Sequence, residues 1–371
     1  MSRPLRVLVA PDSFKGTATA AEVADALARG WHRERPRDEL VLLPQADGGE
    51  GTADAIAAAV PGATWRDAGP VTGPVGTPVP GRWVQLPDGT AVVELAQSSG
   101  LPLLDRFDPM NAGTRGLGEV VRAALAAGAG ALCVTLGGSA STDGGAGALT
   151  GLGALLLDSE GSPLPPGGAA LAALDRIDLD NLVAAPEGGV ELLVDTRAVL
   201  TGPAGAAQVF GPQKGADAAQ IEALDAALGH FAEVVGAALP HDPDRPGTGA
   251  AGGAGYGLGA WGGRIVDGAA RIADLTGLTA TLPTCDVLVT GEGCYDRTSA
   301  TGKVVGSLLD RAREHGLRTV VVAGRLEDRP PDLGLDLTAI AGSRHSATRR
   351  PRWWLRQAAA AAARGLGAAR A

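Results

Sequence analysis

A short apolar run followed by a glycine-rich stretch constrains this chain more than any other feature. Residues 131–136, Ala-Leu-Cys-Val-Thr-Leu, have the length and composition of one buried strand of a parallel sheet. Residues 137–157 follow as GGSASTDGGAGALTGLGALLL, and their Ala- and Leu-rich part predicts a helix. A strand that enters a helix through such a turn aims backbone N–H groups at one place, where glycine lets a phosphate approach. We therefore predict a phosphate-binding turn, with an ordinary strand-to-helix turn as the alternative.

The turn matches neither of two common phosphate-binding motifs. No Gly-Lys-Ser/Thr follows it, as a P-loop would require. Residues 145–151, GAGALTG, carry one residue too many for the dinucleotide fingerprint. The hypothesis rests on the small and polar residues of the turn itself, and the predicted phosphate contacts are Gly137, Gly138, Ser139, Asp143, Gly144 and Gly145.

Length and composition limit the classes of protein that fit. A chain of 371 residues exceeds what one core usually organises, so two domains are expected. Hydrophobic residues at 45% and charged residues at 20% are ordinary for a soluble globular protein. The net charge of −9 argues against a nucleic-acid-binding protein. An acidic protein that handles phosphates would need a metal ion between its carboxylates and the ligand.

Cysteine, histidine and hydropathy patterns favour a cytoplasmic protein. The three cysteines have no paired or metal-type spacing, and the five histidines are scattered, so no zinc site is readable. The chain runs from its first residues into an apolar strand at 5–10, without the apolar core of a signal peptide. Residues 123–142 lack charge, but their glycines and internal turn argue against a membrane span.

Polar residues follow the first two predicted strands. Residues 5–10 lead into a loop with Asp12, Ser13 and Lys15, and residues 39–43 lead into a loop with Asp47 and Glu50. In open α/β sheets ligands bind outside the carboxyl ends of the strands, where these side chains are expected. A lysine that is merely solvated is the alternative for Lys15. Asp47 and Asp143 each precede two glycines at a helix start, so each either caps its helix or faces a metal or hydroxyl, and we prefer the second.

The predicted secondary structure changes along the chain from strand–helix units to a β-hairpin. Residues 82–95 predict a β-hairpin around Asp88-Gly89, so a second domain is expected to begin near residue 73. Residues 249–263 are so rich in glycine that they form either a flexible hinge or tightly packed backbone. Residues 286–290 predict a strand whose exit loop carries Glu292 and Asp296, and a helix opens at Gly302-Lys303.

Acids and lysines together predict phosphoryl transfer. Besides the residues already named, Asp195 follows a strand at 190–194, and Lys214 and Lys303 lie in glycine-bounded loops. Lysines and backbone N–H groups spread the charge of a transferring phosphoryl group, carboxylates hold Mg²⁺, and one carboxylate takes the proton of the acceptor. A small-molecule kinase fits best. The competing classes are an oxidoreductase, which the missing dinucleotide fingerprint disfavours, and a ligand-binding protein without chemistry.

Six motifs in order resemble the bacterial glycerate kinase family over roughly residues 5–345. They are residues 10–16 (APDSFKG), 46–52 (ADGGEGT), 137–147 (GGSASTDGGAG), 210–216 (FGPQKGA), 249–253 (GAAGG) and 291–293 (GEG). The resemblance implies two α/β domains with the active site in the cleft between them. One domain would be Rossmann- or flavodoxin-like and discontinuous, residues 1–72 and 285–371, and the other, residues 73–284, would have a mixed sheet and carry the glycine-rich turn.

The resemblance also implies an activity, ATP-dependent phosphorylation of D-glycerate, mainly at the 2-hydroxyl. Lys15 and Lys214 would contact phosphate or the glycerate carboxylate, Asp47 or Asp296 would be the base, and Asp195 and Glu292 would bind Mg²⁺. The 137–147 turn and Lys303 would bind ATP, whereas Asp12, Ser13 and Glu50 would bind glycerate. No nucleic acid or membrane partner is implied, and a homodimer is left open.

Three departures from the family pattern leave the substrate open. Residues 196–200 read Thr-Arg-Ala-Val-Leu where the family usually has an Asn-Pro run. Cys294 and Thr298-Ser299 replace the usual Arg and Gln-Thr, and Thr142 replaces the usual Asn. A related small hydroxy acid, 3-phosphorylation of glycerate and a nucleotide-binding regulatory protein of the same fold are the alternatives.

Overall fold

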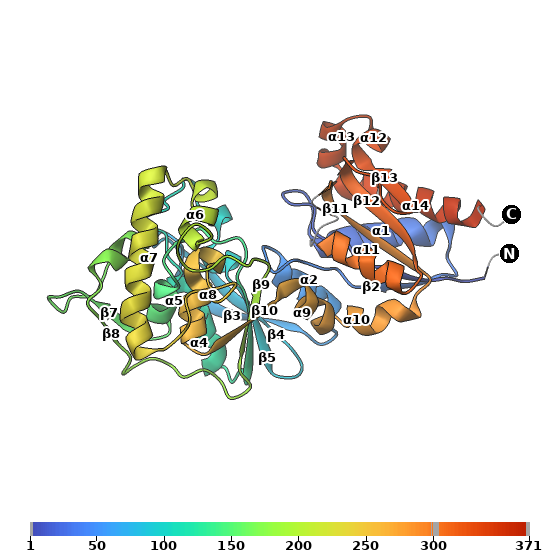
Figure 1. The fold of residues 1–371 in the computed structure, drawn as a ribbon. Coiled ribbons are helices and arrows are strands. Elements are labelled where there is room, and N and C mark those ends of the chain that lie inside the picture. Colours follow the sequence, from blue (N-terminus) through green and yellow to red (C-terminus); the bar gives the residue numbers. More distant parts are fainter. Residues whose placement is uncertain (1–2, 298, 300–303, 369–371) are drawn as a thin grey trace. The chain divides into compact units, whose positions relative to one another are not determined.

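The computed structural model describes residues 3–297, 299 and 304–368 of the chain (Figure 1). Its contacts divide the chain into two compact units. The predicted domain borders at residues 73 and 285 stay predictions, and the strand Thr64–Thr72 already belongs to the sheet of the second unit. The first unit comprises Met1–Asp47, Asp54–Pro61 and Ala269–Ala371, and the second comprises Gly48–Ala53 and Gly62–Gly268.

The first unit is built on a five-stranded parallel sheet in the order β2-β1-β11-β12-β13. This is the flavodoxin-like order of a doubly wound sheet, and it reverses between β1 and β11. The predicted Rossmann- or flavodoxin-like architecture is therefore what the sheet shows. Its strands are β1 (Arg6–Val9), β2 (Glu39–Leu42), β11 (Val287–Tyr295), β12 (Arg318–Leu326) and β13 (Leu333–Asp336).

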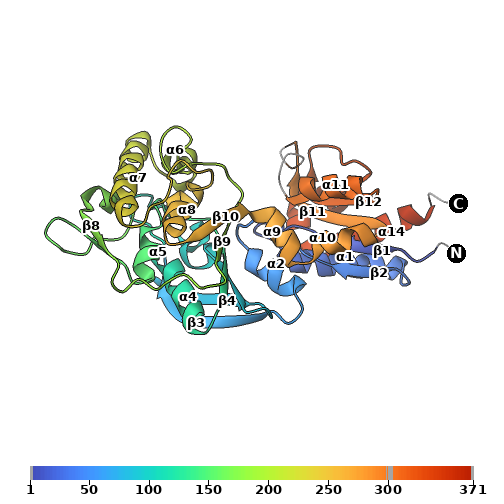
Figure 2. The same ribbon diagram turned by 60° about the horizontal axis from the view of Figure 1, so that its bottom comes forward.

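Helices cover both faces of this sheet (Figures 1 and 2). α1 and α14 pack against one face through a shared core that includes Trp31 and Leu355, and α10 and α11 pack on the other. Thr19 and Glu22 have the sequence spacing of a capping box, and the box forms at the start of α1, because each accepts the other's backbone N–H. The helices are α1 (Ala20–Glu34), α9 (Gly268–Leu275), α10 (Leu278–Thr281), α11 (Val304–Glu314), α12 (Leu337–Ala341), α13 (Arg344–Arg349) and α14 (Pro351–Ala368), with a 3₁₀ turn at Leu282–Thr284.

The packing of α1 on α14 predicts a stability effect at Gly30. A Cβ at this position would clash with the carbonyl oxygen of Arg356, so Gly30→Ala forces two helices apart. We expect Gly30→Ala to lower the free energy of unfolding by about 1–3 kcal/mol in denaturant titrations followed by circular dichroism. Gly365→Ala in α14 is the matched control, since a Cβ there meets nothing and should stabilise by up to about 1 kcal/mol. Equal effects of the two substitutions would contradict the prediction.

The second unit is built on a six-stranded mixed sheet in the order β10-β9-β6-β5-β4-β3. β10, β9, β6 and β5 run parallel, whereas β4 is antiparallel to β5 and β3 to β4. The predicted buried strand is β6, which lies between two parallel neighbours, and the predicted hairpin joins β4 to β5 at Gly89. Its strands are β3 (Thr64–Thr72), β4 (Pro78–Gln85), β5 (Thr90–Glu94), β6 (Ala131–Thr135), β9 (Val190–Val194) and β10 (Gly263–Asp267).

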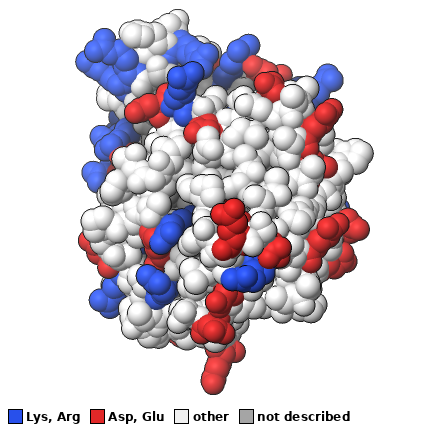
Figure 3. Space-filling view, turned by 90° about the vertical axis from the view of Figure 1, so that its left-hand side faces the viewer, with Lys and Arg blue, Asp and Glu red and all other residues white. Residues whose placement is uncertain are grey.

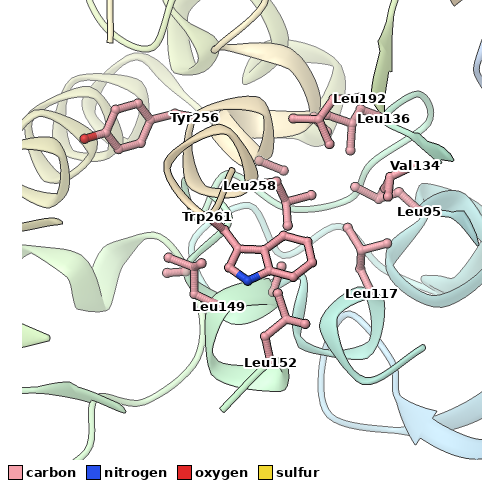
Figure 4. Packing of buried hydrophobic residues seen from close by; sticks show 14 of the residues in the cluster. Leu95, Leu117, Val134, Leu136, Leu149, Leu152, Leu192, Tyr256, Leu258 and Trp261 are labelled. Carbon is pink, nitrogen blue, oxygen red and sulfur yellow. The ribbon is translucent and has the colours of Figure 1, made fainter. Parts of the chain in front are cut away.

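One large core fills the second unit between its sheet and its helices. Figure 4 shows the indole of Trp261 among Leu149, Leu152 and Leu258, and its ring N–H donates to the Val183 carbonyl over 2.7 Å. The helices are α2 (Thr52–Ala59), which continues into the first unit, α3 (Ala96–Ser99), α4 (Arg115–Ala126), α5 (Ala146–Gly151), α6 (Ala206–Phe210), α7 (Ala218–Ala238) and α8 (Ala250–Ala260). Short 3₁₀ turns lie at Leu101–Leu103, Ala169–Ala173 and Pro212–Lys214.

Two sequence predictions of local structure were wrong. The helix expected through Leu157 ends as α5 at Gly151, and Leu155–Leu157 form strand β7, which pairs with β8 (Arg176–Asp178). Gly153 takes a positive φ of 115°, which no helix continues. The exit loop expected at 291–296 is instead mostly strand, since β11 pairs with β12 as far as Tyr295 while its pairing with β1 ends at Val289.

Figure 3 shows the charged side chains on one face of the molecule. On the face in Figure 3, acidic and basic side chains are mixed over a largely uncharged surface, and basic ones gather at its upper left edge. Within the part of the chain that the structure describes, no helix combines the length and apolar character needed to cross a membrane.

Candidate active site

β1 and β2 end beside one another, and β1 ends alongside the middle of β11, at the point where the strand order reverses. The backbone N–H of Asp12, which follows β1, donates to the Gly291 carbonyl in β11 over 2.9 Å. Gln45, which follows β2, donates its N–H to the Pro11 carbonyl over 2.9 Å. These bonds fix the loops after β1 and β2 against β11, at the position where doubly wound sheets bind ligands.

The acidic side chains at this position affect one another. The pKa of Asp12 is raised to about 7, chiefly by burial and then by the charges of Asp47 and Glu292. The N–H of Ser13, 2.6 Å from the Asp12 carboxylate, and the charge of Lys15 oppose this shift. The structure thus brings Asp12, Lys15, Asp47 and Glu292 of the first unit together. The Glu292 side chain is buried, whereas Lys15 is exposed.

Asp296 lies in a turn just beyond β11. Its carboxylate accepts the N–H of Ser299 over 3.1 Å, which holds the turn closed. The ligand atoms of Cys294, Asp296 and Glu327 lie within 4.8 Å of one another, a spacing that a metal ion can bridge. Burial and the charges of Glu327 and Asp296 raise the pKa of Cys294, so the thiol is protonated in the metal-free protein. Lys303 and Thr298 lie outside the described residues.

The glycine-rich turn of the second unit is packed against other backbone. The N–H of Gly137 donates to the Gly48 carbonyl over 3.0 Å, and a Cβ at Gly137 would clash with Gly49. The loop that carries Glu50 therefore lies on the turn. α5, which follows the turn, has six residues, so its dipole is weaker than the sequence prediction of a longer helix implied.

Asp143 is fully buried and holds the turn to α4. Its carboxylate accepts from the N–H and the hydroxyl of Thr114, both over 2.8 Å, and from the N–H groups of Gly145 and Gly147, both over 3.2 Å. Burial raises the pKa of Asp143, and these four hydrogen bonds oppose that shift. The carboxylate thus holds the backbone at the start of α5, although the N-cap residue of this helix is Gly145 and not Asp143, as the capping alternative expected.

Lys214 is buried beneath the same turn, with only 2% of its surface exposed. Its ammonium donates to the Ser139 hydroxyl over 2.9 Å and to the carbonyl of Ser141. Burial lowers the pKa of Lys214 to about 7, and the charge of Asp143 opposes this shift. The lysine predicted to contact a ligand thus holds the turn that carries Ser139.

The glycine-rich segment at 249–263 is packed backbone, as one of its two sequence alternatives predicted. Ala251, Gly252 and Gly253 all have positive φ inside α8, and Ala251 is the only such non-glycine residue among those described. A left-handed alanine costs about 1–2 kcal/mol, which the surrounding packing must offset. A Cβ at Gly252 would clash with the Ser141 carbonyl, and the N–H of Gly144 donates to the Gly252 carbonyl over 3.0 Å.

Sequence reasoning missed Glu94. This buried carboxylate at the end of β5 accepts the N–H of Gly51 over 2.9 Å and of Ala53 over 2.8 Å, so it caps the start of α2. Glu94 thereby positions the loop that bears Glu50. Only its place at a strand exit next to the 137–147 turn could have indicated this role. Glu50 and Asp195, both predicted site residues of the second unit, have exposed side chains.

The arrangement in each unit suits phosphate chemistry. The first unit gathers carboxylates and a lysine at a topological switch point, and the second presents a rigid turn with an ammonium beneath it. Carboxylates that can hold a cation or take a proton, together with fixed donors, are the groups that phosphoryl transfer uses.

Comparison with known proteins defines the class. A sequence model of the glycerate kinase family matches residues 7–366. The glycerate 2-kinase of Escherichia coli K12 is 39% identical over 333 residues, which is 87% of this chain and 86% of that protein. The glycerate kinase of Bacillus subtilis 168 is 38% identical over 328 residues, which is 87% of this chain and 85% of that protein.

A solved structure agrees with this assignment. A crystal structure from Salmonella typhimurium LT2, assigned to a glycerate kinase 2, superimposes with a TM-score of 0.85 at 33% identity. The match covers 99% of this chain and 100% of that one. The chain belongs to the glycerate kinase family.

Proposed function

We propose that this chain transfers the γ-phosphoryl group of ATP to the 2-hydroxyl of D-glycerate, giving 2-phosphoglycerate and ADP. The match to the glycerate kinase family over residues 7–366 carries the proposal. The relative named glycerate 2-kinase supports the choice of the 2-hydroxyl. We place the activity in the cytoplasm, where ATP is supplied.

Asp12 takes the proton of the attacking hydroxyl in this proposal. Its support is its place at the switch point of the first unit, beside Lys15 and two further carboxylates. A carboxylate with a pKa near 7 accepts a proton readily near neutral pH. We choose Asp12 over Asp47 and Asp296, the bases expected from the sequence, because burial and the charges of Asp47 and Glu292 raise its pKa to about 7. Lys15 would stabilise the anionic groups of the substrates.

Magnesium would neutralise charge on the ATP phosphates. Its fit is supported by the donor set, because Asp47 and Glu292 crowd Asp12 with negative charge and carboxylate oxygens are the ligands that Mg²⁺ prefers. Asp195 and Glu292 stay the predicted ligands. The turn at 137–147, held by Lys214 and Asp143, would present its N–H and hydroxyl groups to the nucleotide.

A coupled assay of ADP release tests the activity. With MgATP we expect turnover on D-glycerate and little on lactate or L-glycerate, and ³¹P NMR of the product should show a phosphate on carbon 2. A phosphate on carbon 3 would move the reaction to the other hydroxyl, and faster turnover of another hydroxy acid would change the substrate. Nucleotide binding without turnover on any hydroxy acid would leave a regulatory protein. Light scattering in the same buffer decides between a monomer and a homodimer, which the sequence left open.

A further inference from the structure

Two cavities adjoin each other on the surface formed by α1, α13 and α14 in the first unit. Their volumes are about 460 Å³ and about 480 Å³, and Trp353 lines both. None of their lining residues belongs to the site described above. The first is lined by His345, Ser346, Arg349, Arg350, Trp353 and Trp354, and the second by Arg29, Gly30, His32, Arg33, Trp353, Arg356 and Gln357.

The lining is basic, although the chain carries a net charge of −9. It contains arginines and histidines, and no acidic side chain is among the lining residues that the structure describes. Within the described part of the chain, Arg349 and Arg350 form no ion pair. Arg29 and Arg33 of the second cavity do, with Asp25 over 2.8 Å and with Glu34 over 3.1 Å. The Nε atom of Arg356 is buried and has no hydrogen-bond partner among the described residues. Unpaired guanidinium groups that converge on a cavity favour an anion there.

Trp353 adds an aromatic surface that lines both cavities. Its side chain is 48% exposed, which is high for so large an apolar group. Trp354 fixes it from the edge, with ring centroids 4.3 Å apart, and the Trp354 N–H is itself tied to the Ser346 carbonyl over 3.0 Å. The indole is thus held in place between two cationic cavities, where a planar ring can stack on it.

We propose that this surface binds a small phosphorylated anion, with Arg349 and Arg350 holding its phosphate groups and Trp353 its remaining part. A guanidinium group can bind a phosphate through two parallel hydrogen bonds. Arg349 and Arg350 can do so because neither forms an ion pair within the described residues. The phosphate could belong to an inorganic polyphosphate or to a nucleotide, and the two sources differ in whether a ring covers Trp353.

Hydrogen exchange with pyrophosphate and with ADP as probes locates the binding. We expect each probe to slow exchange in peptides covering residues 343–357. ADP should also change the fluorescence of Trp353, read as the part of the tryptophan fluorescence change that is lost in Trp353→Phe. In Arg349→Ala/Arg350→Ala the apparent affinity measured in these peptides should fall about tenfold or more. Arg106→Ala/Arg122→Ala removes two exposed arginines of the second unit, which form no ion pair within the described residues, and should leave the protection unchanged.

Each outcome of the exchange experiment either supports the proposed anion site or overturns it. Protection at residues 343–357 that is lost in the paired variant and kept in the control supports the proposal. No protection there in the unaltered protein overturns it, and so does equal protection in the paired variant. Binding at the candidate active site changes other peptides, such as those covering residues 10–16 and 137–147, so the two sites are read independently. Pyrophosphate binding without any added effect of ADP on Trp353 fluorescence assigns the site to the phosphate group alone.

Discussion

Asp12→Asn is expected to lower kcat for D-glycerate by about 10²–10⁴-fold, with little change in KM. The amide keeps the size of the carboxylate but cannot accept the hydroxyl proton. The fold should survive, because the Asp12 backbone N–H still donates to the Gly291 carbonyl and an amide oxygen can replace the carboxylate oxygen that faces the N–H of Ser13. Initial rates of ADP release over a range of glycerate concentrations give kcat and KM separately.

Two controls test whether the loss of kcat in Asp12→Asn comes from the loss of the base. Asp25→Asn removes a carboxylate of α1 that is paired with Arg29 at the surface, and its kcat should equal that of the unaltered enzyme. The concentration of Mg²⁺ needed for half-maximal rate should stay unchanged in Asp12→Asn. A large increase in that concentration would show that Asp12 binds the metal, and an unchanged kcat would remove Asp12 from the chemistry.

Local sequence patterns predicted those elements whose residues decide their own conformation. Thr19 and Glu22 form a capping box wherever a helix begins between them, so the start of α1 was readable. Asp88-Gly89 can adopt the backbone angles of a tight hairpin, and the run at 131–136 has no polar face to expose. Each of these features is a property of a few adjacent residues.

Elements that depend on distant partners were not predicted. Leu155–Leu157 are good helix formers, yet they pair with Arg176–Asp178 as a strand. β11 continues to Tyr295 because β12 extends alongside it, and a Cβ at Gly291 would clash with the Val322 carbonyl there. Neither partner can be recognised from the segment itself.

The residues of the candidate site also divide into those that the sequence predicted and those that it missed. Asp12, Asp47 and Glu292 were predicted to be neighbours because strand exits meet at one edge of a parallel sheet, a rule that needs no knowledge of side chains. Glu94 and Thr114 were missed, because Glu94 accepts the backbone N–H of Ala53, 41 residues away, and Thr114 donates to the carboxylate of Asp143, 29 residues away. The burial of Lys214 was equally invisible, since a lysine between glycines is exposed in most loops.

Lys214→Met is expected to reduce kcat/KM by about tenfold to a hundredfold, the range that corresponds to losing hydrogen bonds to a charged group. Methionine fills similar space but cannot donate to the Ser139 hydroxyl or the Ser141 carbonyl. The turn should then lose its alignment while the core around it stays packed. Lys214→Arg should not restore activity, because a planar guanidinium does not fit the space of a fully buried ammonium.

The pH dependence of stability distinguishes this role from one in which Lys214 only contacts a ligand. The pKa of Lys214 is about 7 in the folded protein and 10.5 when unperturbed, with Asp143 as the facing charge. Between these values the unfolded chain holds a proton that the folded chain has released, so Lys214 makes the free energy of unfolding rise with pH. Below pH 7 both states are charged and the burial cost is present in full.

The difference in unfolding free energy between the unaltered protein and Lys214→Met should therefore grow in favour of the unaltered protein from pH 7 to 10. A difference that is flat across this range would mean that the ammonium is solvated, and Lys214 would then be free to contact substrate directly.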